Sequence, residues 1–395
     1  MKIDAFCSIC TTNYFTYARV LKDSLRKSGH KEKYFLLVVD YSKQIEELIS
    51  TEGIMIVKLE DLKLPKQAEL IKRYSAFELC NVLKPYFLEW LLDNEKELDK
   101  LIYLDTDIYV YSSFQAVIKY LEENLDKSVL LLPNITSKSK NILLNSNYDD
   151  SVTFMKAGLY CGGFYAIRND ASSRKFLKWH EGVLLNSGYK ASNNYMFVDQ
   201  KILDFAPLLF DFVGIYKNET YNIAHWNYFE NTLSEKDGKY YINDKLLVFI
   251  HFTFLKIDEK EHQNSTLNII ELKNEKLLLK ICLNYWKLLK ENKLDKIKSI
   301  PYGYTNKYVP ASLELIDPYE NISNMLINSN QNIGQLKTKQ VEKDNKINDL
   351  NKTIEEINRK NKELHDQLNL IFTSKSWKLT LKMRSLRNKL LRSPK

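Results

Sequence analysis

Short apolar runs alternate with helical patterns over the first 130 residues of the chain. Runs rich in β-branched and aromatic residues predict four strands, at Ile3–Ile9, Tyr34–Val39, Ile54–Leu59 and Leu101–Leu104. Apolar residues at helical spacing fill the stretch between the first two strands, and residues 75–92 repeat that pattern. Alternating strands and helices predict parallel strands with helical crossovers, a Rossmann-like α/β fold. Ligands in such sheets bind beyond the carboxyl ends of the strands.

The hydrophobic pattern changes twice in the rest of the chain. Residues 150–255 have a mixed pattern, which predicts helices near 171–185 and 197–205 and a strand at 246–252. Residues 270–325 predict helices followed by an irregular segment. We therefore divide the chain into a body at 1–260, its helical continuation at 261–330, a coiled coil at 331–372 and a tail at 373–395.

From Ile333 onward the apolar residues follow a strict three-four repeat. Nine of twelve such positions are Ile or Leu, and the exceptions are Gln340, Lys343 and Asn361. A seam of more than five heptads predicts a coiled coil and a homo-oligomer, with Asn361 setting the register. The alternative is a single solvated helix, which needs no such seam.

Basic residues are concentrated in the same C-terminal part. The formal net charge is +8, yet residues 331–395 hold sixteen Lys/Arg and seven Asp/Glu, so the body is near neutral. A nucleic-acid-binding body is basic on its own account. The charge distribution therefore argues against nucleic acid as a partner.

The tail combines basic residues with an apolar stripe. After Asp366 there are eight Lys/Arg and no Asp/Glu, and Leu379, Met383, Leu386 and Leu390 recur at helical spacing. Such a helix predicts peripheral contact with an anionic membrane, and the alternative is that the stripe packs on the body. The first four residues lack the apolar core of a signal peptide. We expect a cytoplasmic protein on the inner face of the membrane.

The strongest motif is Asp105-Thr106-Asp107, with apolar strand residues on both sides. Strand side chains alternate, so the two aspartates share a face near the carboxyl end of the strand. Two carboxylates so close are costly without a cation, and oxygen ligands suit Mg²⁺ or Mn²⁺. Such a metal neutralises charge on a nucleoside diphosphate leaving group. The alternative is a solvated strand end.

The chain resembles the GT-A-fold nucleotide-diphospho-sugar transferases, in particular the family 8 retaining glycosyltransferases and their bacterial surface-polysaccharide relatives. The loop after the first strand, Cys10 to Tyr17, matches the pattern with which that family holds uridine. The resemblance implies that Tyr14 stacks on the base, with Asn13 and Thr11 beside it. Asp40, at the end of the second strand, then either binds the nucleotide or caps the next helix.

Two further segments match parts of the family that contact the donor phosphate or sugar. Lys84-Pro85 precedes the metal strand, and the resemblance implies that Lys84 reaches donor phosphate or sugar; the alternative is a solvated lysine. Three of the eleven glycines lie within residues 158–163, which predicts close backbone approach to a ligand or a tight strand entry. Gly162 and Gly163 match the segment that lines the donor sugar, where Cys161 stands in place of the usual Asn.

The remaining site residues lie further along the chain. In related enzymes an Asp-Gln pair flanks the reacting sugar carbon, which implies catalytic roles for Asp199 and Gln200; the alternative for Asp199 is a helix cap. His251 matches the histidine that completes the metal site with Asp105 and Asp107. The Gly and Lys that follow that histidine in the family are replaced here by Phe254 and Ile257.

The resemblance implies a metal-dependent glycosyltransferase that moves a sugar from a UDP-sugar, with retention, to a glycan, lipid-linked or protein acceptor. Two alternatives stay open. One is a nucleotidyltransferase of similar architecture, although no Gly-rich basic loop follows the first strand to hold a triphosphate. The other is a coiled-coil scaffold with a degenerate catalytic body.

Overall fold

The computed structural model describes residues 3–136, 154–191, 195–228, 231–253, 257–258, 263–264, 276–304, 354 and 356–364. The whole basic tail, most of the predicted coiled coil and Phe254 lie outside the described residues. The chain divides into two compact units, Met1–Leu313 and Glu314–Lys395. In the second unit, residues 356–364 are helical. The seam positions Ile354, Ile357 and Leu364 are exposed there, and the coiled coil stays a prediction.

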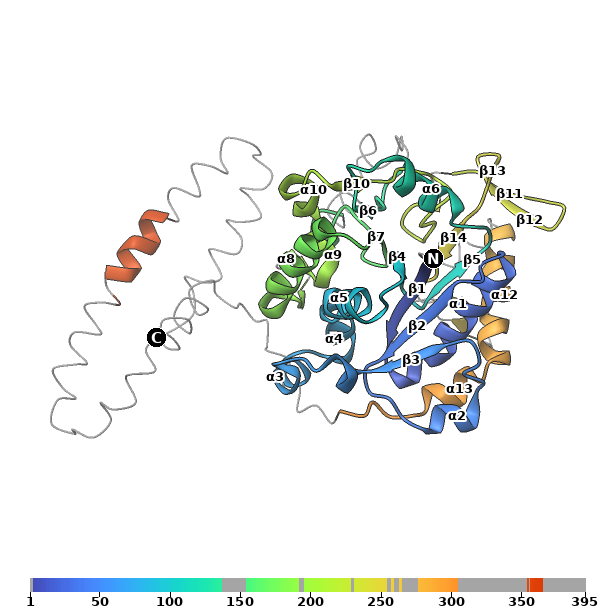
Figure 1. The fold of residues 1–395 in the computed structure, drawn as a ribbon, viewed down its shortest axis with the longest axis horizontal. Coiled ribbons are helices and arrows are strands. Elements are labelled where there is room, and N and C mark those ends of the chain that lie inside the picture. Colours follow the sequence, from blue (N-terminus) through green and yellow to red (C-terminus); the bar gives the residue numbers. More distant parts are fainter. Residues whose placement is uncertain are drawn as a thin grey trace. The chain divides into compact units, whose positions relative to one another are not determined.

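A seven-stranded sheet forms the centre of the first unit, in the order β10-β6-β7-β4-β1-β2-β3 (Figure 1). Neighbouring strands are parallel except where β7 meets β4 and β6. The expected α/β class is thereby confirmed, and the four strands predicted in the first 130 residues are present. The strands are β1 (Ile3–Cys10), β2 (Lys33–Val38), β3 (Met55–Lys58), β4 (Leu98–Leu104), β6 (Val129–Leu131), β7 (Phe164–Arg168) and β10 (Val213–Ile215).

Helices cover both faces of this sheet, because alternate strand residues are buried on opposite sides. One core joins Leu37, Tyr103 and Tyr165 to α3 (Gln67–Arg73), α4 (Ala76–Val82), α5 (Lys84–Asn94) and α8 (Ala171–Ser187). The other core joins alternate strand residues to α1 (Phe15–Lys27), α2 (Gln44–Leu48), α6 (Gln115–Glu123) and α13 (Leu294–Lys298). The sheet is therefore the middle layer of three (Figure 1).

Two features depart from the sequence prediction. The helical pattern at 75–92 is two helices, α4 and α5, because Pro85 occupies the first turn of α5, where its missing N–H costs nothing. The break places Lys84 at the start of α5. The second departure is β7, a strand at 164–168 that the mixed pattern of residues 150–255 did not predict and that lies antiparallel between β4 and β6.

Smaller elements surround the sheet. Strand β5 (Ile108–Val110) pairs with β14 (Phe249–His251) in an antiparallel ribbon, and α12 (Lys276–Glu291) packs beside it. The short hairpins are β8 (Lys190–Ala191) with β9 (Met196–Phe197), β11 (Leu233–Lys236) to β13 (Lys245–Leu246) through β12 (Lys239–Ile242), and β15 (Ile257–Asp258) with β16 (Gln263–Asn264). The remaining short helices are α9 (Val198–Ile202), α10 (Ala206–Leu209), η1 (Thr12–Tyr14), η2 (Leu59–Leu62) and η4 (Leu203–Phe205). None of the helices in the described residues has the length and hydropathy needed to cross a bilayer.

Candidate active site at the sheet edge

The topology gathers the predicted site residues at one edge of the sheet. Strands β1 and β4 are parallel neighbours, so the Thr11–Tyr14 turn and Asp105 follow their carboxyl ends side by side. Strand β7 runs in the opposite direction, so the glycines that precede it arrive at the same edge. The backbone N–H of Asp105 donates to the Gly163 carbonyl at 2.9 Å, which fixes the two segments together.

Asp105, Asp107 and His251 form a three-residue cluster. Each offers one ligand atom, and these atoms all lie within 4.8 Å of one another. His251 Nε2 lies 3.1 Å from Asp107 Oδ1 and 3.9 Å from Asp105 Oδ2. The β5–β14 ribbon causes this convergence, because it pairs His251 with Ile108, the residue after Asp107. Two carboxylates and an imidazole are a donor set that suits a divalent cation.

Asp107 and His251 shift each other's pKa. Burial alone would raise the pKa of Asp107, but the His251 imidazole beside it holds that pKa below its ordinary value. Burial would lower the pKa of His251, but Asp107 and its hydrogen bond raise that pKa well above the ordinary value. Without a cation the pair is therefore an ion pair. A metal ion binds neutral imidazole, so metal binding would release that proton.

His251 is held from several sides. Thr253 Oγ1 lies 3.0 Å from its Nε2, and Cys161 Sγ lies 3.8 Å from its Nδ1. The Trp226 ring meets the imidazole edge-on, with centroids 5.7 Å apart. Cys161, which stands where related enzymes have Asn, thus faces the imidazole. This contact could not be inferred from the sequence.

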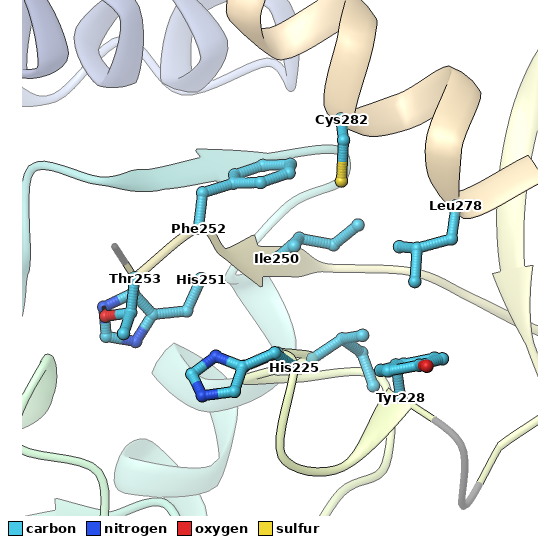
Figure 2. Close-up of a pocket in the computed structure, with 10 residues that line it drawn as sticks. His225, Tyr228, Ile250, His251, Phe252, Thr253, Leu278 and Cys282 are labelled. Atoms are coloured by element: carbon cyan, nitrogen blue, oxygen red, sulfur yellow. Dashed lines mark hydrogen bonds between the residues drawn. The ribbon is translucent and has the colours of Figure 1, made fainter. Parts of the chain in front are cut away.

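A pocket opens beside His251, between β14, the 221–228 loop and α12 (Figure 2). Figure 2 shows Cys282 and Leu278 reaching down from α12 and His225 rising from the loop. Burial lowers the pKa of His225 to about 4, so this imidazole is neutral near pH 7. The other lining residues are Ile223, Ala224, Tyr228, Ile250, Phe252 and Thr253. The pocket is therefore mostly apolar with a few polar groups next to the cluster.

Gly162 and Gly163 directly precede β7 and bring the backbone close to side chains of the site. Their predicted approach to a ligand stays a prediction. A Cβ at Gly163 would lie 2.7 Å from His251 Cε1 and 2.9 Å from Asp105 Oδ2. A Cβ at Gly162 would lie 3.1 Å from both the Asp199 carboxylate and Gln200 Cβ. The backbone thus approaches the side chains of the site itself, and any added side chain would displace them.

Gly163→Ala is expected to weaken Mn²⁺ binding at least about 10-fold, because the methyl group forces Asp105 and His251 apart. Calorimetry with Mn²⁺ measures the effect. Gly182→Ala is the matched control: Gly182 lies in α8, and its Cβ would meet nothing within 4 Å. That variant should bind Mn²⁺ normally and gain up to about 1 kcal/mol in stability. Equal Mn²⁺ affinity of the Gly163 and Gly182 variants would contradict the geometry.

Lys84 is buried, so the solvated alternative is wrong. Its Nζ donates to the Gly162 carbonyl at 2.7 Å and to Asp199 Oδ2 at 3.0 Å, and lies 3.4 Å from Asp105 Oδ1. Burial would lower the pKa of Lys84, but Asp105 and Asp199 raise it above the ordinary value. The ammonium is therefore charged; it donates two hydrogen bonds and forms an ion pair with Asp105. Its contact with donor phosphate or sugar stays a prediction.

Asp199 and Gln200 open the short helix α9. The Asp199 carboxylate is fully buried, and burial raises its pKa despite the nearby Lys84. Gln200 Oε1 accepts from the Gly162 N–H at 3.1 Å, and its Nε2 donates to the Ala157 carbonyl at 3.0 Å. The preceding Val198 has a φ of 42°, which a β-branched residue rarely adopts. The capping alternative for Asp199 is wrong, because the N-cap residue of α9 is Phe197 and the Asp199 carboxylate accepts from Tyr165 and Lys84 instead. Its catalytic role stays a prediction.

The predicted nucleotide site lies at the end of β1. Tyr14 is 44% exposed, and its ring stacks on Tyr17 at 5.1 Å. Thr11 Oγ1 donates to Asn13 Oδ1 at 2.6 Å. Asp40 accepts from the backbone N–H groups of Thr12 and Gly303, at 2.6 and 2.9 Å. Asp40 therefore ties this turn to residues 302–304, a contact that the sequence did not indicate.

Two buried tyrosines at the site were missed by the sequence analysis. Tyr103 donates to Asp105 Oδ1 at 2.7 Å, and Tyr165 donates to Asp199 Oδ2 at 2.6 Å. Tyr103 lies two residues before Asp105 and so shares its strand face, which was an available signal. Tyr165 had no such signal, because its partner is 34 residues away.

Comparison with known proteins gives distant similarities. No protein-family model matches the chain. The uncharacterized protein YfnF of Bacillus subtilis is 26% identical over 257 residues, covering 64% of this chain and 82% of YfnF. The uncharacterized protein YfnD of the same organism is 23% identical over 280 residues, covering 70% of this chain and 85% of YfnD.

Several glycosyltransferases are among the solved structures to which this chain is similar. The galactosyltransferase LgtC, in complex with donor and acceptor sugar analogs, has a TM-score of 0.45 and 14% identity, covering 73% of this chain and 96% of LgtC. GlyE of Streptococcus pneumoniae TIGR4 has a TM-score of 0.42 and 15% identity, covering 75% of this chain and 64% of GlyE. Mouse xyloside xylosyltransferase 1 has a TM-score of 0.37 and 12% identity, covering 64% of this chain and 98% of the mouse protein. At these values, the activity of this chain has to follow from its own residues.

Proposed function

We propose that this chain is a metal-dependent glycosyltransferase that moves a sugar from a UDP-sugar donor to a glycan, lipid-linked or protein acceptor. The observation that carries the proposal is the Asp105–Asp107–His251 cluster. It lies at the sheet edge where ligands bind in this class of fold. The exposed Tyr14 lies in η1, which follows β1, and the Asp199–Gln200 pair lies next to Gly162.

The cluster fits a divalent cation. Carboxylate oxygens suit both Mg²⁺ and Mn²⁺, and an imidazole ligand favours Mn²⁺. Asp105, Asp107 and His251 would hold the ion, which would neutralise charge on the departing diphosphate. Thr253, Cys161 and Trp226 then orient the imidazole, as groups around a metal ligand commonly do.

The protein's own groups are arranged for the remaining tasks. Tyr14 offers an open aromatic face for a base. Gln200, on the other side of Gly162, would contact the sugar near the reacting carbon, and Asp199 would hold its hydroxyl groups. We propose transfer with retention, in which the acceptor hydroxyl attacks from the face that the diphosphate leaves. No carboxylate of the predicted motifs is placed as an evident covalent nucleophile, so the proposal includes no double displacement.

Tyr14→Ala should weaken UDP binding by about 1–3 kcal/mol, because stacking on the base is lost. Tyr14→Phe keeps the aromatic face and should bind UDP nearly as well as the wild type. Calorimetry with UDP in the presence of Mn²⁺ measures both variants. Normal UDP binding by Tyr14→Ala would remove Tyr14 from the donor site. Tight binding of another nucleoside diphosphate in place of UDP would overturn the uridine assignment.

We also propose that the C-terminal part brings the enzyme to a membrane as an oligomer. A coiled coil at 331–372 would gather several basic tails and multiply their binding. Removal of residues 373–395 should release the protein from anionic vesicles at low salt, with the oligomeric state unchanged. Removal of the chain from Ile333 onward should give active monomers. Vesicle sedimentation and light scattering measure these outcomes, and a full-length protein that ignores anionic vesicles would refute the membrane contact.

A further inference from the structure

Tyr103 and Tyr165 are directly opposite one another on the antiparallel strands β4 and β7. Both side chains are buried, and their rings meet edge-on with centroids 5.7 Å apart. Their hydroxyl groups reach two different carboxylates of the candidate site. The Tyr103 hydroxyl donates to Asp105 at 2.7 Å, and the Tyr165 hydroxyl donates to Asp199 at 2.6 Å.

Lys84 joins these two pairs into one chain of polar contacts. Its ammonium lies 3.4 Å from Asp105 Oδ1, the oxygen that accepts from Tyr103. It also lies 3.0 Å from Asp199 Oδ2, the oxygen that accepts from Tyr165. Each carboxylate therefore uses one oxygen for both a tyrosine hydroxyl and the shared cation.

The second oxygen of each carboxylate has a different environment. Asp105 Oδ2 faces the metal cluster, 3.9 Å from His251 Nε2. Asp199 Oδ1 accepts no hydrogen bond from the parts of the chain that the structure describes. An ionised carboxylate only accepts hydrogen bonds, so each tyrosine hydroxyl is the donor of its pair.

We propose that Tyr103 and Tyr165 are positioning residues that each fix one oxygen of a carboxylate and turn the other towards a ligand. Tyr103 aims Asp105 at the metal ion, and Tyr165 aims Asp199 at the donor sugar. This inference rests on the proposed function of the site. The two tyrosines contact each other but bond to different carboxylates. Loss of the Tyr103 hydroxyl should therefore affect metal binding, and loss of the Tyr165 hydroxyl should affect turnover, whereas a purely structural role would affect both alike.

The test compares Tyr103→Phe with Tyr165→Phe, which remove one hydroxyl each and keep the buried rings. Mn²⁺ affinity is measured by calorimetry, and kcat is measured at saturating Mn²⁺ from release of UDP. Tyr103→Phe should weaken Mn²⁺ binding about 10- to 100-fold, as removal of a group that orients a metal ligand commonly does. Tyr165→Phe should leave Mn²⁺ affinity within about twofold and lower kcat about 10-fold or more.

Tyr34→Phe is the matched control, because Tyr34 is equally buried near the beginning of β2, away from this edge of the sheet. It should change neither Mn²⁺ affinity nor kcat, whatever it does to thermal stability. If both site variants shift only the melting temperature, or both change the same parameter equally, the inference is overturned. A wild-type protein that neither binds Mn²⁺ nor releases UDP would instead refute the proposed function, so the two failures are distinguishable.

Discussion

Asp105→Asn and Asp107→Asn are each expected to lower kcat/KM for sugar transfer by at least about 1000-fold. Each substitution removes a negative charge from the metal cluster with almost no change in volume. The fold should persist, because the sheet core around β4 is apolar and untouched. Release of UDP from the donor measures transfer, Mn²⁺ calorimetry measures the site, and circular dichroism reports the fold.

Matched variants sharpen this prediction. Asp126→Asn makes the same chemical change at a side chain that is 71% exposed, and should be fully active. His251→Ala should weaken Mn²⁺ dependence in the same direction as the aspartate variants. Wild-type turnover that continues in EDTA, or an unchanged Mn²⁺ titration in Asp105→Asn, would refute a metal mechanism.

Lys84→Met is expected to destabilise the protein by about 3–5 kcal/mol and to abolish transfer. The substitution leaves Asp105 and Asp199 without the ammonium that lies between them. Denaturation with urea measures the loss. Lys119→Met is the control, because that lysine is 66% exposed and its pair with Glu123 is worth about 0.5 kcal/mol or less.

The loss of stability in Lys84→Met should depend on pH. Burial already raises the pKa of Asp199, and removal of Lys84 should raise it further. A carboxyl group with a raised folded-state pKa costs stability above its unfolded pKa of about 3.9 and costs none below it. The difference between wild type and Lys84→Met should therefore be largest near pH 7 and shrink as the pH falls towards 4. A constant difference over this range would show that lost packing, not lost charge, causes the effect.

The pattern of apolar and polar residues predicted the strands, because strand formation depends largely on residues that are close in sequence. Periodicity located β1, β2, β3 and β4, because each is a short apolar run closed by a turn. The Asp-x-Asp motif and the resemblance together led to the three residues that the structure brings within 4.8 Å. Strand β7 was not predicted, and its antiparallel direction depends on the path of the chain between elements, which the local pattern of a strand does not encode.

Long-range contacts account for most of what the sequence did not provide. Lys84 and Asp199 are separated by 115 residues, and Cys161 and His251 by 90. A lysine at the start of a helix is normally solvated, and only the tertiary structure places Lys84 between two carboxylates. The contact between the Asp40 carboxylate and the Gly303 N–H, 263 residues away, could not be read from the sequence. Binding of Asp40 to the nucleotide stays a prediction.

The central claim is metal-dependent sugar transfer from a nucleotide sugar, and one measurement tests it most directly. The full-length protein is incubated with a panel of nucleotide sugars and Mn²⁺, and free nucleoside diphosphate is quantified. We predict release of UDP from at least one UDP-sugar, lost on addition of EDTA and lost in Asp105→Asn. Release of pyrophosphate from a nucleoside triphosphate would instead indicate a nucleotidyltransferase. No release of UDP from any donor, or release that EDTA does not affect, would contradict the account.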